Sequence, residues 1–502
     1  MTAVPPFLSA AASNSRLVVN AIVLRPFIHQ RLRPALRNPA TFASLSTVGL
    51  FGASLVLKLV SNLVLSRLVL PDVFGLMALV SIAVMGLTLL SDVGLAPAVV
   101  QHRKGSDPDF LCTAWTVQVV RGLGIWVACW IAAPLVSNFY SEPILFVLIP
   151  IVGFTAAIEG FASTGIMTVQ RRLKPTAMIA YNVLSQLIGT IVTCIIAFFY
   201  PTIWALVAGA LAASTTRMTS SFLLPSEMRH RFRWNPEFAR DLFHFGKWIF
   251  VSTAATFFAM QVDRMVLGRI GSLETLGLYT LATTIAMLPV LLITHIGDYV
   301  MFPLLARSAR ETPEKLAAEV APVRGRMLGF GLIMNVGVFA IAPIFFGRLY
   351  GAQYADAGRL CQWMVFAGWG SVVSGLAVQT LKAIGDVKSM ATGKMIRFFM
   401  TIPCTLIGFT QFGLEGFIVG YTLGIVPEHL WNGYRLWSTK LFFPLQDLAY
   451  TLAFTAAIIV LHLFGTTIVS AAALVCLVSG ITLATVYWME SKVRGELATQ
   501  ST

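Results

Sequence analysis

The 502-residue sequence is poor in charge. Charged residues make up 12% of it, about half of the roughly 25% found in an average soluble domain. Apolar residues make up 57%, and the mean hydropathy is +0.79. A soluble fold of this length needs a polar surface that this composition does not supply. Disordered chains, disulfide scaffolds and coiled coils are excluded as well, so the composition predicts a polytopic, all-α membrane protein.

Paired cysteines and catalytic motifs are also absent. The six cysteines occur singly in or beside apolar runs, without a CxxC pair or a Cys/His cluster: Cys112, Cys129, Cys194, Cys361, Cys404 and Cys476. This pattern favours small packing residues over a zinc or redox centre. The chain contains no GxxxxGK[ST] loop, no GxSxG and no HExxH. We therefore expect no cofactor, no metal and no nucleic-acid partner, and we do not expect an enzyme.

Acidic residues are missing from the start of the chain, since the first is Asp72. Residues 1–40 instead carry five arginines, at positions 16, 25, 31, 33 and 37, and five prolines that interrupt any long helix. The apolar run 17–24 is too short to cross a bilayer. We expect residues 1–40 to be a basic cytoplasmic tail. It either lies on the anionic inner leaflet or is a simple extension.

Long apolar runs dominate the remaining sequence. Fourteen runs of about 20 residues, the length that crosses a bilayer, occur at roughly 42–66, 73–100, 110–133, 144–168, 177–199, 201–224, 242–267, 274–300, 327–346, 357–380, 395–411, 412–434, 447–465 and 467–489. The runs are continuous instead of alternating, which excludes a transmembrane β-barrel. They predict about 14 transmembrane helices.

The basic residues test this count independently. With the N-terminus inside, 27 of the 36 lysines and arginines fall in the tails or in alternate loops, and about four fall in the remaining loops. Positive charge collects on the cytoplasmic side of membrane proteins, so both termini are expected inside. The loops are short, which argues against a catalytic domain outside the membrane.

The chain also resembles itself at a shift of 202 residues, which brings 63–79 onto 265–281. Gly75 and Leu76 then match Gly277 and Leu278, and Arg67 matches Arg269. A weaker match at a shift of 211 brings Thr190 and Gly209 onto Thr401 and Gly420.

Because six spans separate the copies, the two halves run in the same direction, as parallel transporter repeats do. The expected parts are the tail 1–40, a six-helix lobe 41–224, a cytoplasmic linker 225–241, a second six-helix lobe 242–434, two further helices in 435–491 and a cytoplasmic tail 492–502.

Charges inside the spans are the candidate site residues, because a charge at mid-bilayer usually faces a cavity or a partner. The candidate cations, which would bind an anionic substrate in a cavity between the lobes, are Lys58, Arg121, Arg217, Lys247 and Arg264. The candidate acids, which would couple transport to an ion, are Asp92, Glu159, Asp263, Asp298 and Glu428.

Several of these candidates have simpler alternatives. Lys247 and Arg264 lie near span ends and could extend to the membrane surface. Asp92 could cap a broken helix, whereas Glu159 and Glu428 could pair with neighbouring cations. Asp263 and Arg264 are adjacent and cannot share a helix face, so only one is expected to point into the cavity.

Several short motifs, in this order along the chain, are similar to those of one transporter family. They are Asn62–Arg67 followed by Pro71–Leu76, Ser91–Leu95 with Val99–Gln101, Ala205–Gly209, Asp263–Arg269 with Gly277–Tyr279, and Phe302–Pro303. The chain resembles the Wzx-type flippases of lipid-linked oligosaccharides. These belong to the superfamily that also contains multidrug exporters and the lipid II flippase. The resemblance covers about residues 42–490, and the basic extension 1–40 departs from it.

The resemblance implies a multi-pass transporter of the bacterial inner membrane. Its substrate would be a polyprenyl-pyrophosphate-linked sugar repeat, its surroundings membrane lipids, and its partners a polysaccharide polymerase and assembly proteins. The glycan stays open, as does coupling to H⁺, to Na⁺ or to no ion. The alternatives are a multidrug exporter, a membrane glycosyltransferase or polymerase, and a non-transporting scaffold.

Overall fold

The computed structural model describes residues 39–91, 95, 99, 107–171, 175–224, 231–311, 313–439 and 441–464. All regular structure in these ranges is helical. The first half contains α2 (Pro39–Leu68), α3 (Pro71–Leu90), α5 (Pro108–Tyr140), α6 (Leu145–Gly160), α7 (Gly165–Arg171), α8 (Pro175–Phe199) and α9 (Ile203–Ser221). The second half contains α10 (Pro236–Ile270), α11 (Leu273–Ala286), α12 (Leu288–Ile296), η2 (Gly297–Met301), α13 (Phe302–Glu311), α14 (Pro313–Ile344), η3 (Phe345–Leu349), η4 (Ala352–Tyr354), α15 (Ala355–Ala383), α16 (Val387–Trp437) and α17 (Pro444–Phe464).

The helices begin where local chemistry favours a start. Proline occupies the first position of α3 and α5, where its missing N–H costs nothing. The Asp107 carboxylate accepts a hydrogen bond from the Asp109 N–H at the start of α5, and the Ser272 hydroxyl accepts one from Thr275 at the start of α11. The Ser272 cap fixes the short connection between α10 and α11, and the Asp107 cap fixes the start of α5.

The predicted spans agree with the helices. Every predicted span up to 447–465 overlaps helical residues, and 467–489 lies outside the described residues. Within the described ranges, nine segments are long and apolar enough to cross a membrane, and one of them, α16, contains two predicted spans. Two predicted spans are divided, 144–168 into α6 and α7 and 274–300 into α11, α12 and η2, and α14 begins well before the predicted start at 327. Large apolar side chains such as Leu135 and Phe198 are about 70% exposed, as lipid-facing residues are.

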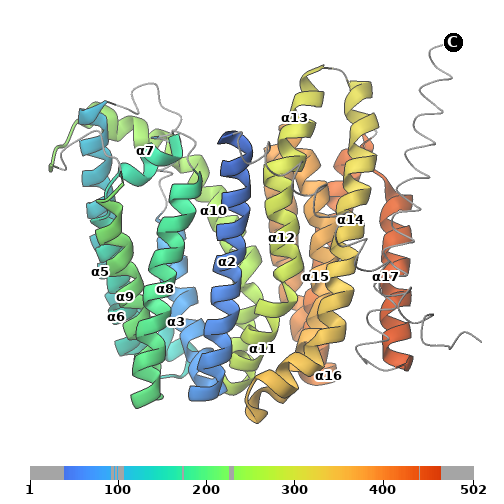
Figure 1. Ribbon diagram of the computed structural model, residues 1–502, viewed down its shortest axis with the longest axis horizontal. Helices are drawn as coiled ribbons and strands as arrows, with labels where there is room; N and C mark the ends of the chain where they lie inside the picture. Colours follow the sequence, from blue (N-terminus) through green and yellow to red (C-terminus); the bar gives the residue numbers. More distant parts are fainter. Residues whose placement is uncertain are drawn as a thin grey trace, which may run out of the picture.

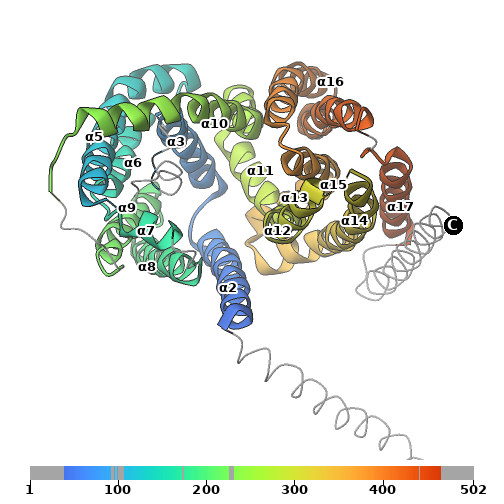
Figure 2. The same cartoon turned by 90° about the horizontal axis from the view of Figure 1, so that it is seen from above.

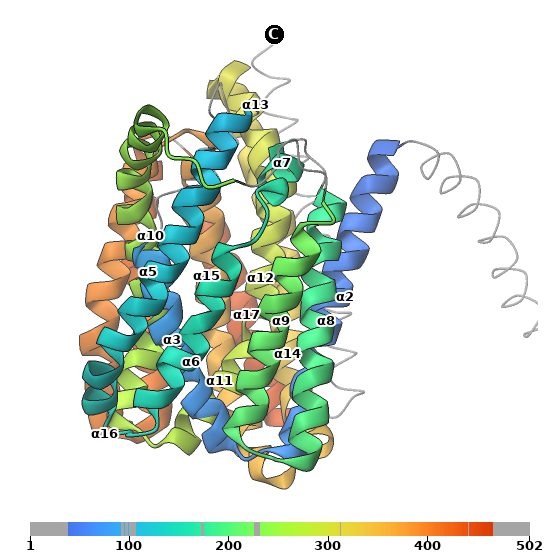
Figure 3. The ribbon, with the colours of Figure 1, turned by 90° about the vertical axis from the view of Figure 1, so that its left-hand side faces the viewer.

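The helices form two lobes. One contains α2 to α9 and the other α11 to α17, with the long helix α10 crossing between them (Figures 1 and 2). In the first lobe α5 packs on α6 and α8 packs on α9, as the side view shows (Figure 3). In the second lobe α15 packs between α14 and α16. Helices α2, α3, α10 and α11 surround the middle of the molecule (Figure 2).

Helix ends with more lysine and arginine gather at one end of the molecule. We call this the basic end; it contains the starts of α2, α14 and α16 and the end of α15 (Figure 1). The loops that the predicted topology assigns to the cytoplasm and that are described lie there. Four other basic residues lie at the opposite end: Arg67, Arg269, Arg348 and Arg359.

The repeated segments meet at that opposite end. A Cβ atom built on Gly75 of α3 would lie 2.0 Å from the carbonyl oxygen of Leu273, and one built on Gly277 of α11 would lie 1.8 Å from that of Pro71. Only glycine permits this approach on either side. The repeat that the sequence shows is therefore the contact surface between the lobes.

A second set of contacts ties α2 to the second lobe at the same end. The Arg67 guanidinium donates hydrogen bonds to the carbonyl oxygens of Arg348 and Leu349 at 2.6–3.2 Å. The Tyr354 hydroxyl donates to the Val69 carbonyl oxygen at 2.7 Å. We call these contacts the Arg67 latch. They hold the lobes together at the end opposite the basic end.

Candidate functional site

Two candidate cations approach each other in the middle of the molecule. Lys58 lies on α2 and Arg264 on α10, close enough for their charges to repel each other. Lys58 is exposed and Arg264 is half-buried, with one hydrogen bond from its guanidinium to Gln261 Oε1 at 3.0 Å. Helices α2 and α10 both lie in the middle of the molecule, where the lobes meet (Figure 2), so an anion shared by this pair would contact both helices.

Asp263 points away from this pair, as its position beside Arg264 on the helix requires. It is 2% exposed and accepts a hydrogen bond from the Tyr279 hydroxyl of α11 at 2.7 Å. Its other oxygen, Oδ1, has no hydrogen-bond partner among the described residues. A buried carboxylate with one unsatisfied oxygen is a candidate site for a proton or a small cation.

Glu428 lies within the second lobe, in a group of charges on α16. Helix α16 reverses direction at Phe412 and Gly413, where Gly413 adopts a φ of 61°, so its two halves pack side by side. Glu428 is 1% exposed and forms ion pairs with Lys394 at 2.7 Å and with Arg397 at 3.4 Å. Arg397 also donates to the Tyr421 hydroxyl at 2.9 Å. Two cations around one carboxylate leave this buried group with net positive charge.

Arg121 is held by the end of α3. Its Nε donates to the Ser91 carbonyl oxygen at 2.9 Å and its Nη2 to that of Thr88 at 2.7 Å. These carbonyls are the unpaired acceptors of a helix C-terminus, which a cation stabilises. In this conformation Arg121 therefore supports α3, and its role as a substrate ligand stays a prediction.

Arg217 and Glu159 form an ion pair of 2.8 Å between α9 and α6, with both side chains about 40% exposed. The buried hydroxyl of Tyr181 is near both charges. Of the two roles predicted for Glu159, the structure contains the ion pair with a neighbouring cation. The pair is accessible enough to exchange partners.

Asp298 lies in the π-helical turn η2. Its carboxylate contacts two side chains of α15, Lys382 Nζ at 2.7 Å and Gln379 Nε2 at 3.0 Å. This position is at the basic end, so Asp298 is separate from the central cations. The last two candidates are not described: Asp92 lies outside the described residues, and so does the side chain of Lys247.

Three basic residues that were counted in loops lie in helices, and two of them are buried. Lys394, Arg397 and Arg324 were counted with the cytoplasmic loops, but α14 and α16 extend to include them, and the two arginines are 8% or less exposed. Arg324 pairs with Asp447 of α17 at 2.7 Å, and His429 Nε2 lies 3.4 Å from the same carboxylate. The sequence feature that could have identified Lys394 and Arg397 as a pair is their spacing of three residues, which puts both on one helix face.

A metal site is not indicated in the described part of the chain, where no three His, Cys, Asp or Glu side chains form a group suited to an ion.

The sequence comparisons agree with the fold. A family model described as "Polysaccharide biosynthesis protein" matches residues 64–359. The lipopolysaccharide biosynthesis protein WzxC of Escherichia coli K12 is 24% identical over 399 residues, which covers 78% of this chain and 79% of WzxC. The succinoglycan biosynthesis transport protein ExoT of Rhizobium meliloti is 23% identical and covers 62% of each chain.

Solved structures give the same architecture. The lipid II flippase MurJ in an inward closed conformation aligns with a TM-score of 0.69 at 14% identity, covering 89% of this chain and 98% of MurJ. An inward-facing MATE multidrug transporter aligns with a TM-score of 0.60 at 15% identity, covering 76% and 94%. These likenesses concern the fold. Together with the family match, they show that the chain is a multi-pass membrane protein of the polysaccharide biosynthesis family, similar in sequence to WzxC and ExoT and with the fold of MurJ and the MATE transporters.

Proposed function

We propose that this protein moves polyprenyl-pyrophosphate-linked oligosaccharide repeats across the bacterial inner membrane, for assembly of an exopolysaccharide, O-antigen or capsule. Hydrated sugars and phosphate groups cannot cross hydrocarbon unaided. The names of the relatives support this substrate class, since they concern lipopolysaccharide, teichuronic acid and succinoglycan. The protein is a transporter in this proposal and not an enzyme, and a polysaccharide polymerase would receive its cargo.

The observation that carries the proposal is the approach of Lys58 and Arg264 between the lobes. Two cations that repel each other gain most from an anion shared between them, and a pyrophosphate has oxygens for both. The guanidinium of Arg264 offers a planar fork for phosphate oxygens. The sugar would occupy the space between the lobes, while the lipid tail stays in the bilayer.

Transport in this proposal alternates between two arrangements of the lobes. The glycine contact of α3 with α11 and the Arg67 latch join the lobes at the end opposite the basic end. Rocking of the lobes about the middle of the molecule would release these contacts and bring the two lobes together at the basic end. The basic end is the cytoplasmic face, because positive charge collects there. Asp263 is the favoured coupling group, since its free oxygen can take up a proton or a small cation.

A genetic experiment tests the substrate class. Deletion of the gene should abolish the surface polysaccharide and accumulate lipid-linked repeats on the inner face. Normal polysaccharide together with drug sensitivity would instead favour a multidrug exporter. Formation of a glycosidic bond by the purified protein from a lipid-linked donor would establish a polymerase.

A further inference from the structure

A cavity of about 720 Å³ opens at the basic end of the second lobe. Its walls include Phe302, Ala306 and Ala309 of α13, Lys382 of α15, and Thr439 and Leu441 of the loop that joins α16 to α17. All of these elements belong to the second lobe, so the cavity is distinct from the Lys58–Arg264 pair on α2 and α10. Its volume is in the range of small-molecule sites, roughly 300–1,000 Å³.

Most of the residues that line the cavity are apolar, and apolar side chains on α13 and the adjoining η2 are exposed on the outside of the molecule. The alanines of α13 face the cavity, whereas Leu304 on the same helix is 39% exposed and Val300 of η2 is 58% exposed. Exposed apolar side chains beside a transmembrane segment contact lipid. The acyl chain of a lipid could therefore enter the cavity from the bilayer while it stays in contact with apolar side chains.

Lys382 is the cation of this cavity. Its Nζ lies 2.7 Å from Asp298 Oδ1 and 4.8 Å from the centre of the Phe302 ring. Both members of the ion pair are about 40% exposed, and pairs exposed to this degree are weakly held. An incoming phosphate oxygen can therefore bind to Lys382, whose ammonium has three donors.

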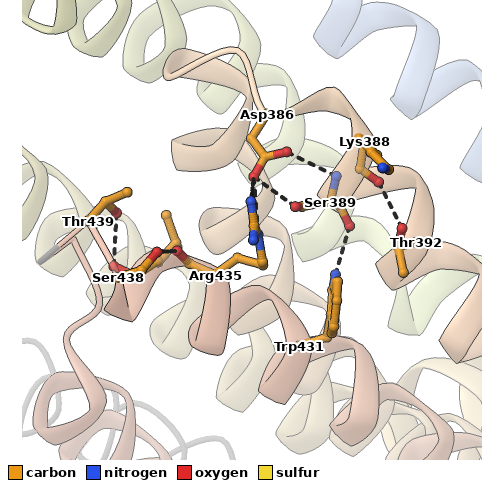
Figure 4. Close-up of polar contacts among 9 residues, drawn as sticks. Asp386, Lys388, Ser389, Thr392, Trp431, Arg435, Ser438 and Thr439 are labelled. Carbon is orange, nitrogen blue, oxygen red and sulfur yellow. Dashed lines mark hydrogen bonds and ion pairs between the residues drawn. The ribbon is translucent and has the colours of Figure 1, made fainter.

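The end of the cavity near the α15–α16 turn is held in place by hydrogen bonds. Asp386 caps α16 by accepting from the Ser389 N–H at 3.1 Å and hydroxyl at 2.7 Å, and it also accepts from Arg435 at 3.0 Å (Figure 4). The Thr439 hydroxyl donates to the Leu436 carbonyl oxygen at 2.9 Å. The Arg435–Asp386 pair joins the last turn of α16 to its N-cap, and the Thr439 bond fixes the start of the following loop, so both support this wall of the cavity.

We propose that this cavity binds one anionic phospholipid of the adjacent leaflet, with an acyl chain along α13 and the headgroup phosphate at Lys382. The apolar walls with one cation suit a molecule that has a long apolar part and a single negative group. The bilayer is the proposed source because the apolar side chains of Val300 and Leu304 are exposed on the elements that form the cavity. This site does not depend on the proposed transport of a lipid-linked sugar.

Retained lipid provides the test. The full-length protein is reconstituted in phosphatidylcholine nanodiscs that contain some phosphatidylglycerol, re-extracted in mild detergent and examined by native mass spectrometry. We expect one bound phosphatidylglycerol. Lys382→Gln should reduce retention of the lipid about tenfold, because it removes one charge-assisted contact with the phosphate. Ala309→Trp, which fills the cavity, should reduce it similarly.

The matched control is Lys388→Gln, which removes an exposed cation six residues away at the same end and should leave retention unchanged. Equal retention by the parent and Lys382→Gln, or equal retention of phosphatidylcholine, would overturn the proposal. Displacement of the lipid by added inorganic phosphate would do the same, since it indicates a free-phosphate site. If Ala309→Trp does not fold, as judged by gel filtration and circular dichroism, the Lys382→Gln comparison decides.

Discussion

At the scale of single residues, many of the intramembrane charges have protein partners. Glu428 is held by Lys394 and Arg397, Arg217 by Glu159, and Arg121 by the carbonyls of α3. The sequence located most of these charges in the membrane, because charge is rare in apolar runs. It could not identify the partners, since they come from other helices far apart in the chain. Lys58 and Arg264 differ from the rest because they repel each other.

Asp386 gives a residue-scale prediction outside the membrane spans. Burial opposes ionisation of its carboxyl, but hydrogen bonds from Ser389 and Arg435 outweigh it and hold the pKa below its usual value. Asp386→Ala should therefore lower the free energy of unfolding by about 1 kcal/mol at neutral pH, as loss of an N-cap does.

The pH dependence of this effect has a definite sign. A lowered pKa in the folded state stabilises the protein above the unfolded pKa of about 3.9, and this part is lost as the pH falls through the folded value. The difference in thermal unfolding between the parent and the Ala variant should thus shrink as the pH falls below about 3.9. Asp386→Asn, which can still cap the helix, is the control and should be milder. A difference that stays constant with pH would contradict this role of the charge.

At the scale of helices, the sequence predicted the positions of the spans but not how they are bent or joined. The break between 395–411 and 412–434 was expected, and α16 reverses there at Gly413. The divisions within α11–α13 and α6–α7 were not expected, because each segment is apolar on both sides of its break. The close packing of the α16 halves could not be predicted either, since glycines in apolar runs have several uses.

The α16 hairpin gives an element-scale prediction. A Cβ atom added at Gly420 would lie 2.1 Å from the Cys404 carbonyl oxygen, so Gly420→Ala must separate the two halves. We expect a loss of about 1–3 kcal/mol in stability, as for other overpacked sites, and a lower thermal midpoint. Gly375→Ala in α15 is the control, because nothing lies within 4 Å of the added atom. Equal midpoints for the two variants would contradict the packing argument.

At the scale of the whole molecule, the repeat in the sequence predicted two lobes, and the structure shows what the repeat does. The glycines at 75 and 277, which match each other in the repeat, lie where the lobes touch. The Arg67 latch could not be predicted, because it joins a side chain to backbone carbonyls about 280 residues away. The boundaries at 225–241 and 434–435 stay predictions.

The latch gives a prediction about the equilibrium between the lobe arrangements. Arg67→Ala removes three hydrogen bonds, each worth about 0.5–1.5 kcal/mol, and should increase the population that is open at this end. Spin labels at the exposed positions Asn138 and Gln411, one on each lobe, should then show longer distances. Arg359→Ala, which removes a basic residue at the same end, serves as the control. An unchanged distance distribution in the Arg67 variant would show that the latch does not restrain the lobes.

The central claim is that Lys58 and Arg264 hold the anionic head of a lipid-linked sugar between the lobes. The most direct measurement is translocation of a fluorescent polyprenyl-pyrophosphate oligosaccharide in proteoliposomes. The Lys58→Gln, Arg264→Gln double variant should lose at least about tenfold in rate, as expected when charge-assisted contacts disappear, while Lys58→Arg with Arg264→Lys should retain much of it. A double Gln variant that inserts normally and transports at the parental rate would contradict the account.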